Sequence, residues 1–156
     1  MLQTLNRLVG TALALALTAL TATAQIPCVN GDAGGYPCQN IDLMGYLSSD
    51  EVGGGDMNDI WGWIDPSDGT EYAILGRSTG TSFIDISDPA NPVMVANLPT
   101  NTVTSFWRDI KVHDNHAFIV SEASGHGMQV VDLTQLGGID NPPEDIEADA
   151  LYTGWG

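Results

Sequence analysis

Between residues 56 and 136 the chain alternates short apolar runs with clusters of turn-forming residues. The runs are rich in Ile, Val, Phe, Tyr and Trp and are four to six residues long, which is typical of β-strands and too short for helices. Asp, Ser, Gly, Asn and Pro separate them, at 65–69 and again at 87–92. Strands are therefore predicted at 59–64, 72–75, 82–86 and 93–98. Since no long apolar stripe at helical spacing follows residue 24, we expect an all-β fold.

The same pattern recurs 44 to 50 residues further along the chain. Asp59-Ile60 reappears as Asp109-Ile110, residues 72–75 reappear as 116–119, and residues 83–86 reappear as 130–133. Unequal shifts are expected where loops of different length join repeated strands. Four short strands in a unit of this size are typical of a β-propeller blade. A β-sandwich is the alternative, because strand number alone does not separate the two folds, but the recurrence strand by strand favours the propeller.

Five segments of the chain resemble a known family. FIDISDPANP at 83–92 and GMQVVDL at 127–133 look like LVIVD repeats. Together with the Cys28…Tyr36-Pro37-Cys38 segment, NDIWGW at 58–63 and WRDIKV at 107–112, they resemble the choice-of-anchor B family of secreted bacterial proteins. The resemblance covers nearly the whole chain after residue 24. It implies a seven- or eight-bladed-type propeller at the cell surface, usually followed by a sorting or anchoring tail, and it brings no established reaction.

The length of the repeat predicts an incomplete ring. Residues 56–156 hold about two blades of LVIVD type, and 149–152 would begin a third, whereas a closed propeller needs at least four. The chain is also far shorter than the proteins it resembles. We expect a truncated propeller whose open blades self-associate, and a natural gene that continues past Gly156.

The N-terminus has the layout of a secretory signal peptide. Residues 1–7 carry one positive charge, residues 8–24 carry none, and Ala22-Thr23-Ala24 has the small-x-small pattern that signal peptidase recognises. Cleavage is predicted between Ala24 and Gln25. A membrane anchor is the alternative, but the uncharged stretch has 17 residues, four of them Thr, which is at the lower limit for a span. No later segment is apolar enough to cross a membrane.

Cys28 and Cys38 are the only cysteines. In an oxidising compartment, two cysteines ten positions apart usually pair, and the residues between them are turn formers. A metal pair is the alternative, but two thiols with no nearby His are too few for a structural zinc site. We therefore predict a disulfide between Cys28 and Cys38.

The charge of the chain excludes some partners. It contains 20 Asp+Glu and 4 Lys+Arg, a formal charge of −16. Nucleic-acid binding requires a basic surface, and anionic membranes repel an acidic one. The expected partners are a protein or a glycan at the cell surface, and the expected location is secreted, extracellular or cell-surface, with the periplasm as an alternative.

One loop brings potential catalytic residues together in sequence. SEASGHG at 121–127 contains Ser121, Glu122, Ser124 and His126. It lacks the Gly-x-Ser-x-Gly elbow, and a catalytic triad is defined by geometry and not by proximity in sequence. We interpret it as a glycine-bounded loop between strands, so no catalytic residue is assigned.

Metal ligands are also not assigned, and no cofactor is expected. Clustered candidates are limited to His113, His116, His126, Asp109, Asp114 and Glu122. They lack the His-Glu-x-x-His spacing of a zinc site. Calcium suits the carboxylate-rich turns better, around Asp85, Asp88 and Asp132, but no Asp-x-Asp-x-Asp-Gly loop is present. For Asp85 and Asp132 we predict instead that the carboxylate accepts backbone N–H groups of the following turn.

Three tryptophans lie in or beside the first strand of each repeat: Trp61, Trp63 and Trp107. Packing between neighbouring sheets is the interpretation that we prefer, and an exposed pair would instead be a platform for a sugar.

We therefore divide the chain into a signal peptide at 1–24, a disulfide-bearing segment with a Gly-rich link at 25–55, and the blades at 56–156. The predicted function is a non-catalytic binding scaffold outside the cell. An extracellular hydrolase with its site in a propeller channel and a structural surface-layer component are the alternatives.

Overall fold

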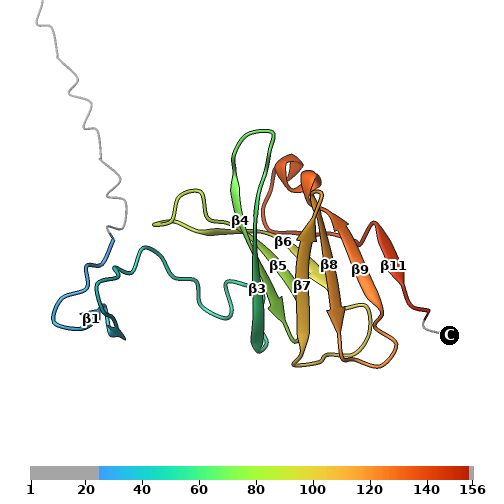
Figure 1. The fold of residues 1–156 in the computed structure, drawn as a ribbon, viewed down its shortest axis with the longest axis horizontal. Helices are drawn as coiled ribbons and strands as arrows, with labels where there is room; N and C mark the ends of the chain where they lie inside the picture. The colour runs from blue at the N-terminus through green and yellow to red at the C-terminus, as the bar shows by residue number, and fades with distance from the viewer. Residues whose placement is uncertain (1–24, 155–156) are drawn as a thin grey trace, which may run out of the picture.

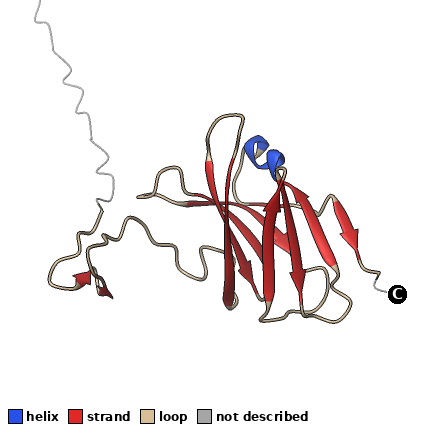
Figure 2. Ribbon diagram, viewed as in Figure 1, coloured by secondary structure: helices blue, strands red, loops and turns tan. Residues whose placement is uncertain are grey.

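The computed structural model describes residues 25–154 (Figure 1). The predicted signal peptide, up to Ala24, lies outside the described residues. Two antiparallel sheets form the body of the chain, and a small two-stranded hairpin lies near the N-terminus (Figure 2). The prediction of an all-β fold is confirmed, since the helical part of the described chain is one 3-10 segment.

The first sheet is a four-stranded antiparallel meander with one short added strand. Its strands are β3 (Met57–Ile64), β4 (Glu71–Arg77), β5 (Gly80–Asp85) and β6 (Val93–Pro99). Each pairs with the next, and β10 (Glu144–Asp145) adds to β6 in parallel. All four predicted strands are therefore present.

The second sheet repeats this arrangement. It consists of β7 (Arg108–His113), β8 (His116–Ser121), β9 (Met128–Asp132) and β11 (Ala150–Tyr152). The 3-10 segment η1 (Leu133–Gly138) and β10 lie between β9 and β11 in sequence. The hairpin near the N-terminus pairs β1 (Asp32–Ala33) with β2 (Tyr36–Pro37).

The last strand differs from the sequence prediction. Residues 149–152 were expected to begin a further unit, but β11 pairs antiparallel with β9 and completes the second sheet. The sequence prediction was wrong because η1 and the loop after it separate β9 from β11 by 17 residues. The corresponding strands of the first sheet, β5 and β6, are separated by only seven.

The two sheets are equivalent row by row. In the first sheet Trp61, Ile74, Phe83 and Ala96 lie opposite one another across β3, β4, β5 and β6. The row at the same repeat positions of the second sheet contains Lys111, Phe118, Val130 and Ala150. We call the face of each sheet that carries this row its front face, and the opposite face its back face.

The core forms where the front face of the first sheet packs on the back face of the second. Ile74 and Phe83 from the first sheet and Ile110, Ile119 and Val131 from the second are fully buried in one cluster. Side chains of this size each contribute about 1.5–3 kcal/mol when they leave water. The stacking of two equivalent sheets therefore supplies most of the apolar burial.

A second, smaller cluster covers the back face of the first sheet. Val52, from the segment before β3, is buried against Ile84 and Met94, and Leu47 packs at the edge. The Ser82 hydroxyl donates to the Val52 carbonyl at 2.6 Å, and Arg77 donates to the Gly53 carbonyl at 2.6 Å. The Gly-rich stretch that the sequence suggested as a link is thus bonded to the first sheet.

Candidate functional site

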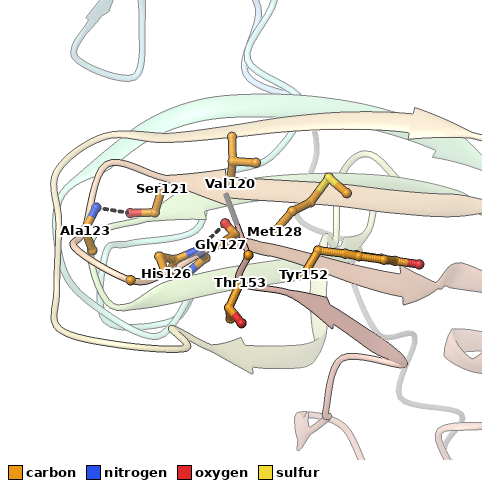
Figure 3. Close-up of a pocket in the computed structure, with 10 residues that line it drawn as sticks. Val120, Ser121, Ala123, His126, Gly127, Met128, Tyr152 and Thr153 are labelled. Atoms are coloured by element: carbon orange, nitrogen blue, oxygen red, sulfur yellow. Dashed lines mark hydrogen bonds between the residues drawn. The ribbon is translucent and has the colours of Figure 1, made fainter. Parts of the chain in front are cut away.

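The loop between β8 and β9 lines a pocket of about 620 Å³ (Figure 3). The pocket is bounded on one side by Val120, Met128 and Tyr152, which lie opposite one another on the front face of the second sheet. Backbone and small residues of the loop form the other side. The lining is mainly apolar, so the pocket suits an apolar side chain better than an ion.

His126 lies under this loop and is fully buried. Its Nδ1 is 3.0 Å from the Gly127 carbonyl, as Figure 3 shows, and its Nε2 is 3.1 Å from Nη1 of Arg108. Both ring nitrogens are engaged, so neither is available to Ser121 or Ser124. The Ser121 hydroxyl instead accepts the N–H of Ala123 at 3.2 Å. The arrangement holds the loop in place and gives no nucleophile–base pair.

Arg108 is also buried, with 2% of its surface exposed, and the groups to which it donates are neutral. The guanidinium donates to the Arg77 carbonyl at 3.0 Å, to the Thr100 hydroxyl at 2.9 Å and to His126. Burial lowers the pKa of Arg108 to about 10, and the charge of Arg77 adds to this effect. Arg108 therefore joins β4, β7 and the loop after β6 through bonds that fix its position.

Arg77 forms a similar centre on the back face of the first sheet. Besides Gly53, it donates to the Thr79 hydroxyl at 2.8 Å and to the Asn97 side chain, and Asn97 in turn donates to Asp145 at 2.7 Å. Burial lowers the pKa of Arg77. Sequence reasoning missed both arginines as structural centres, although they hold two of the four positive charges of the chain at strand positions.

The turn carboxylates bind backbone, as predicted. Asp85 accepts the N–H of Ser87 at 2.8 Å, and Asp132 accepts the N–H of Thr134 at 3.0 Å. Asp88 accepts the N–H of Ala90 at 3.0 Å, and hydrogen bonds from Asn91 and Ala90 lower its pKa. Bonds from Thr134 lower the pKa of Asp132 in the same way. These side chains lie in separate turns, and no group of three metal-ligating residues occurs among residues 25–154.

The remaining histidines face each other across the β7–β8 turn, at paired positions 113 and 116. His113 Nε2 lies 3.2 Å from the carboxylate of Asp114, at an exposed position, and His116 Nδ1 lies 2.7 Å from the Asp114 carbonyl. His126 is at the other end of β8 and β9. The structure thus separates His126 from His113 and His116, although all three lie close together in sequence.

The tryptophans have three different environments. Trp63 is buried, stacks on Tyr72 with ring centroids 5.5 Å apart, and donates its indole N–H to Asn115 at 3.1 Å. Trp61 is half-exposed under the Lys111 ammonium, 4.5 Å from the ring centroid. Packing between sheets is therefore confirmed for Trp63.

For Trp107 the packing interpretation is wrong, because 56% of its surface is exposed. Trp107 lies just before β7, where a strand pattern no longer places its ring between sheets. Phe106 contacts the indole edge-to-face, with ring centroids 4.8 Å apart.

A second depression lies beside this exposed indole. It has a volume of about 490 Å³ and is lined by Asn58, Asp59, Trp107, Arg108, Asp109, Val120, Ser121 and Glu122. We call it the Trp107 groove. It combines one exposed aromatic face with carboxylate oxygens. A 2.7 Å hydrogen bond from Lys111 lowers the pKa of Asp109. Aromatic faces with flanking hydrogen-bond acceptors are chemically suited to a sugar ring.

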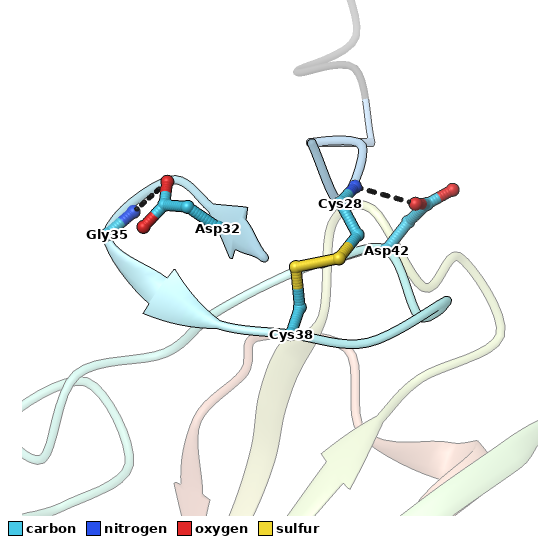
Figure 4. Close-up of a disulfide and its surroundings, with 5 residues drawn as sticks. All are labelled: Cys28, Asp32, Gly35, Cys38 and Asp42. Atoms are coloured by element: carbon cyan, nitrogen blue, oxygen red, sulfur yellow. Dashed lines mark hydrogen bonds between the residues drawn. A yellow bond between two sulfur atoms is a disulfide. The ribbon is translucent and has the colours of Figure 1, made fainter. Parts of the chain in front are cut away.

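The disulfide between Cys28 and Cys38 is present, and it closes the N-terminal hairpin (Figure 4). Asp32 and Asp42 brace the loop, since Asp32 accepts the N–H of Gly35 and Asp42 accepts the N–H of Cys28. A disulfide is compatible with an oxidising compartment. Among the described residues, no helix is long and apolar enough to cross a membrane.

Comparisons of the chain with protein-family models, curated proteins and solved structures found no match.

Proposed function

We propose that this protein is a secreted or cell-surface scaffold built from LVIVD-type propeller blades, and that it binds a glycan without catalysing a reaction. The observation that carries the proposal is the stacking of two equivalent four-stranded meanders, front face on back face, with matching rows. Stacked sheets of this kind present loops on a rigid support. The resemblance to the choice-of-anchor B family and the disulfide support the extracellular assignment.

The Trp107 groove is the binding site in this proposal. Its exposed indole supplies a flat apolar face, and Asp109 and Glu122 supply carboxylates at the rim. Negative groups at this rim would repel acidic sugars, so neutral and amino sugars are the favoured class. The buried, doubly engaged His126 offers no base, which supports binding over hydrolysis.

A glycan array probed with the full secreted chain tests this proposal. Binding to neutral or amino sugars is expected, and Trp107→Ala should weaken it by about two- to tenfold, because stacking on one aromatic ring contributes about 0.5–1.5 kcal/mol. Trp61→Ala is the matched control, since this half-exposed indole lies under Lys111 and outside the groove. Equal binding by the Trp107→Ala variant, or no binding by a folded wild type, would contradict the proposal.

A further inference from the structure

The front face of the second sheet is largely open, whereas Ile74, Phe83 and Ala96 on the front face of the first sheet are fully buried. Ile74 and Phe83 are buried against the second sheet. At the equivalent positions Phe118 is half-buried and Val130 is buried, while Val120 and Tyr152 beside them are 40% and 61% exposed. The apolar row therefore continues onto an open surface, which ends in the 620 Å³ pocket.

The back face of the first sheet, in contrast, is closed. Val52 is 3% exposed in its cluster with Ile84 and Met94, and Ser82 and Arg77 bond the backbone of the same segment. The segment before β3 thus acts as a terminal cap, as the end repeats of stacked-repeat proteins do. The stack is capped on one side and open on the other.

The contact between the first and second sheets indicates which kind of surface would fit the open front face of the second sheet. Asp59, on β3, accepts the backbone N–H of Ile110 at 2.8 Å, and so satisfies a backbone group of β7, the edge strand of the second sheet. Asp109 occupies the equivalent position on β7, with its carboxylate exposed and held by Lys111. The second sheet therefore presents the same acceptor as the first.

We infer that the front face of the second sheet is a docking surface for the back face of another four-stranded sheet of this type. Aliphatic side chains of the incoming sheet would cover Phe118, Val120 and Tyr152, as Ile110, Ile119 and Val131 cover the first sheet. Asp109 would accept a backbone N–H of its edge strand. This inference rests on the blade stacking in the proposed function and names the partner of one surface.

The protein itself can supply the probe, because its own capped sheet has such a back face. Val52→Asp places a charge in the apolar cluster and should release the cap, which exposes Ile84 and Met94. Labelled wild-type protein should then bind immobilised Val52→Asp protein saturably and one to one, and Val52→Asp protein alone should form open-ended assemblies, since this contact is head-to-tail. If Val52→Asp loses its strand signal in circular dichroism, Leu47→Asp, at the rim of the same cluster, exposes the face more mildly.

Substitutions in the wild-type partner locate the contact. Phe118→Asp and Tyr152→Asp should abolish the binding, and Asp109→Ala should weaken it by about tenfold, as expected for loss of one charged hydrogen bond. Ile41→Asp, an exposed position in the N-terminal loop, adds the same charge elsewhere and should change nothing.

Two results would overturn the inference: no binding to a folded, uncapped variant, or binding that Phe118→Asp and Tyr152→Asp leave intact. Wild-type dimers that these two substitutions abolish would also overturn it, because the occupant would then be the front face of a second copy. Neither Phe118 nor Tyr152 lines the Trp107 groove, so the Phe118→Asp and Tyr152→Asp variants should bind the glycan as the wild type does, and the two proposals can fail separately. Asp109 lines the groove as well, so Asp109→Ala is expected to affect both kinds of binding.

Discussion

The buried contact between Arg108 and His126 fixes the protonation of the imidazole. A guanidinium can only donate, so Nε2 of His126 must accept, and Nδ1 carries the proton that is donated to the Gly127 carbonyl. Burial lowers the pKa of His126 below its ordinary value of 6.5, and the charge of Arg108 acts in the same direction. The folded protein therefore keeps His126 neutral at a pH where the unfolded chain begins to protonate it.

This difference predicts a loss of stability on acidification. Below about pH 6.5 the unfolded state binds a proton at His126, whereas the folded state does not until its lower pKa is reached. The free energy of unfolding, from urea titrations at pH 5, 6 and 7, should fall as the pH falls through this window. His126→Gln should flatten this part of the profile, and His113→Gln, at an exposed position, should not. A profile that is unchanged in His126→Gln would contradict the assignment.

At the scale of single elements, the sequence predicted strands well where apolar alternation is bounded by turn residues. The cores of β3 to β9 and the bonds of Asp85 and Asp132 follow from local chemistry, which a sequence displays directly. The pairing of β11 depends on contacts across an insertion, and the burial of Arg108 depends on acceptors from β4 and the loop after β6. Such long-range partners leave no local pattern, so neither could be predicted.

The turn before β9 gives a test of how loop and sheet depend on each other. Gly125 and Gly127 both have a φ near +70°, which disfavours any residue with a Cβ. A Cβ at Gly127 would also lie 2.3 Å from the Tyr152 carbonyl of β11, whereas nothing lies within 4 Å of one at Gly125. Gly125→Ala should therefore cost about 1 kcal/mol of unfolding free energy, the backbone strain alone.

Gly127→Ala should lower the free energy of unfolding by clearly more than Gly125→Ala does. It should also weaken the pairing of β11 with β9. Faster amide hydrogen exchange at residues 150–152 is the specific signature, measured in both variants against the wild type. Equal losses of stability in the two variants, with equally slow amide exchange in β11, would contradict this prediction. The close approach to Tyr152 would then not contribute to stability.

For the molecule as a whole, charge is the dominant surface property. The sequence has 20 acidic residues, and Arg77 and Arg108 are buried, so Lys111 is the exposed cation within the described range. Many carboxylates already accept hydrogen bonds from turns, as Asp68, Asp85, Asp88 and Asp132 do. The rest repel one another across solvent, an interaction that extends about 30 Å at 0.01 M salt and about 8 Å at 0.15 M.

This distribution predicts that the protein is stabilised by ionic strength and not by calcium in particular. The melting temperature should rise between 0.01 and 0.15 M NaCl, because screening weakens the repulsion in the folded state more than in the expanded chain. Calcium and magnesium at matched ionic strength, each added after chelator, should raise the melting temperature equally, since the described residues contain no group of three side chains that could hold a metal ion. A calcium rise of about 4 °C or more that magnesium does not reproduce corresponds to about 1 kcal/mol of specific binding. Loss of that rise in Asp88→Asn or Asp132→Asn would then place a calcium site in these turns, against the prediction.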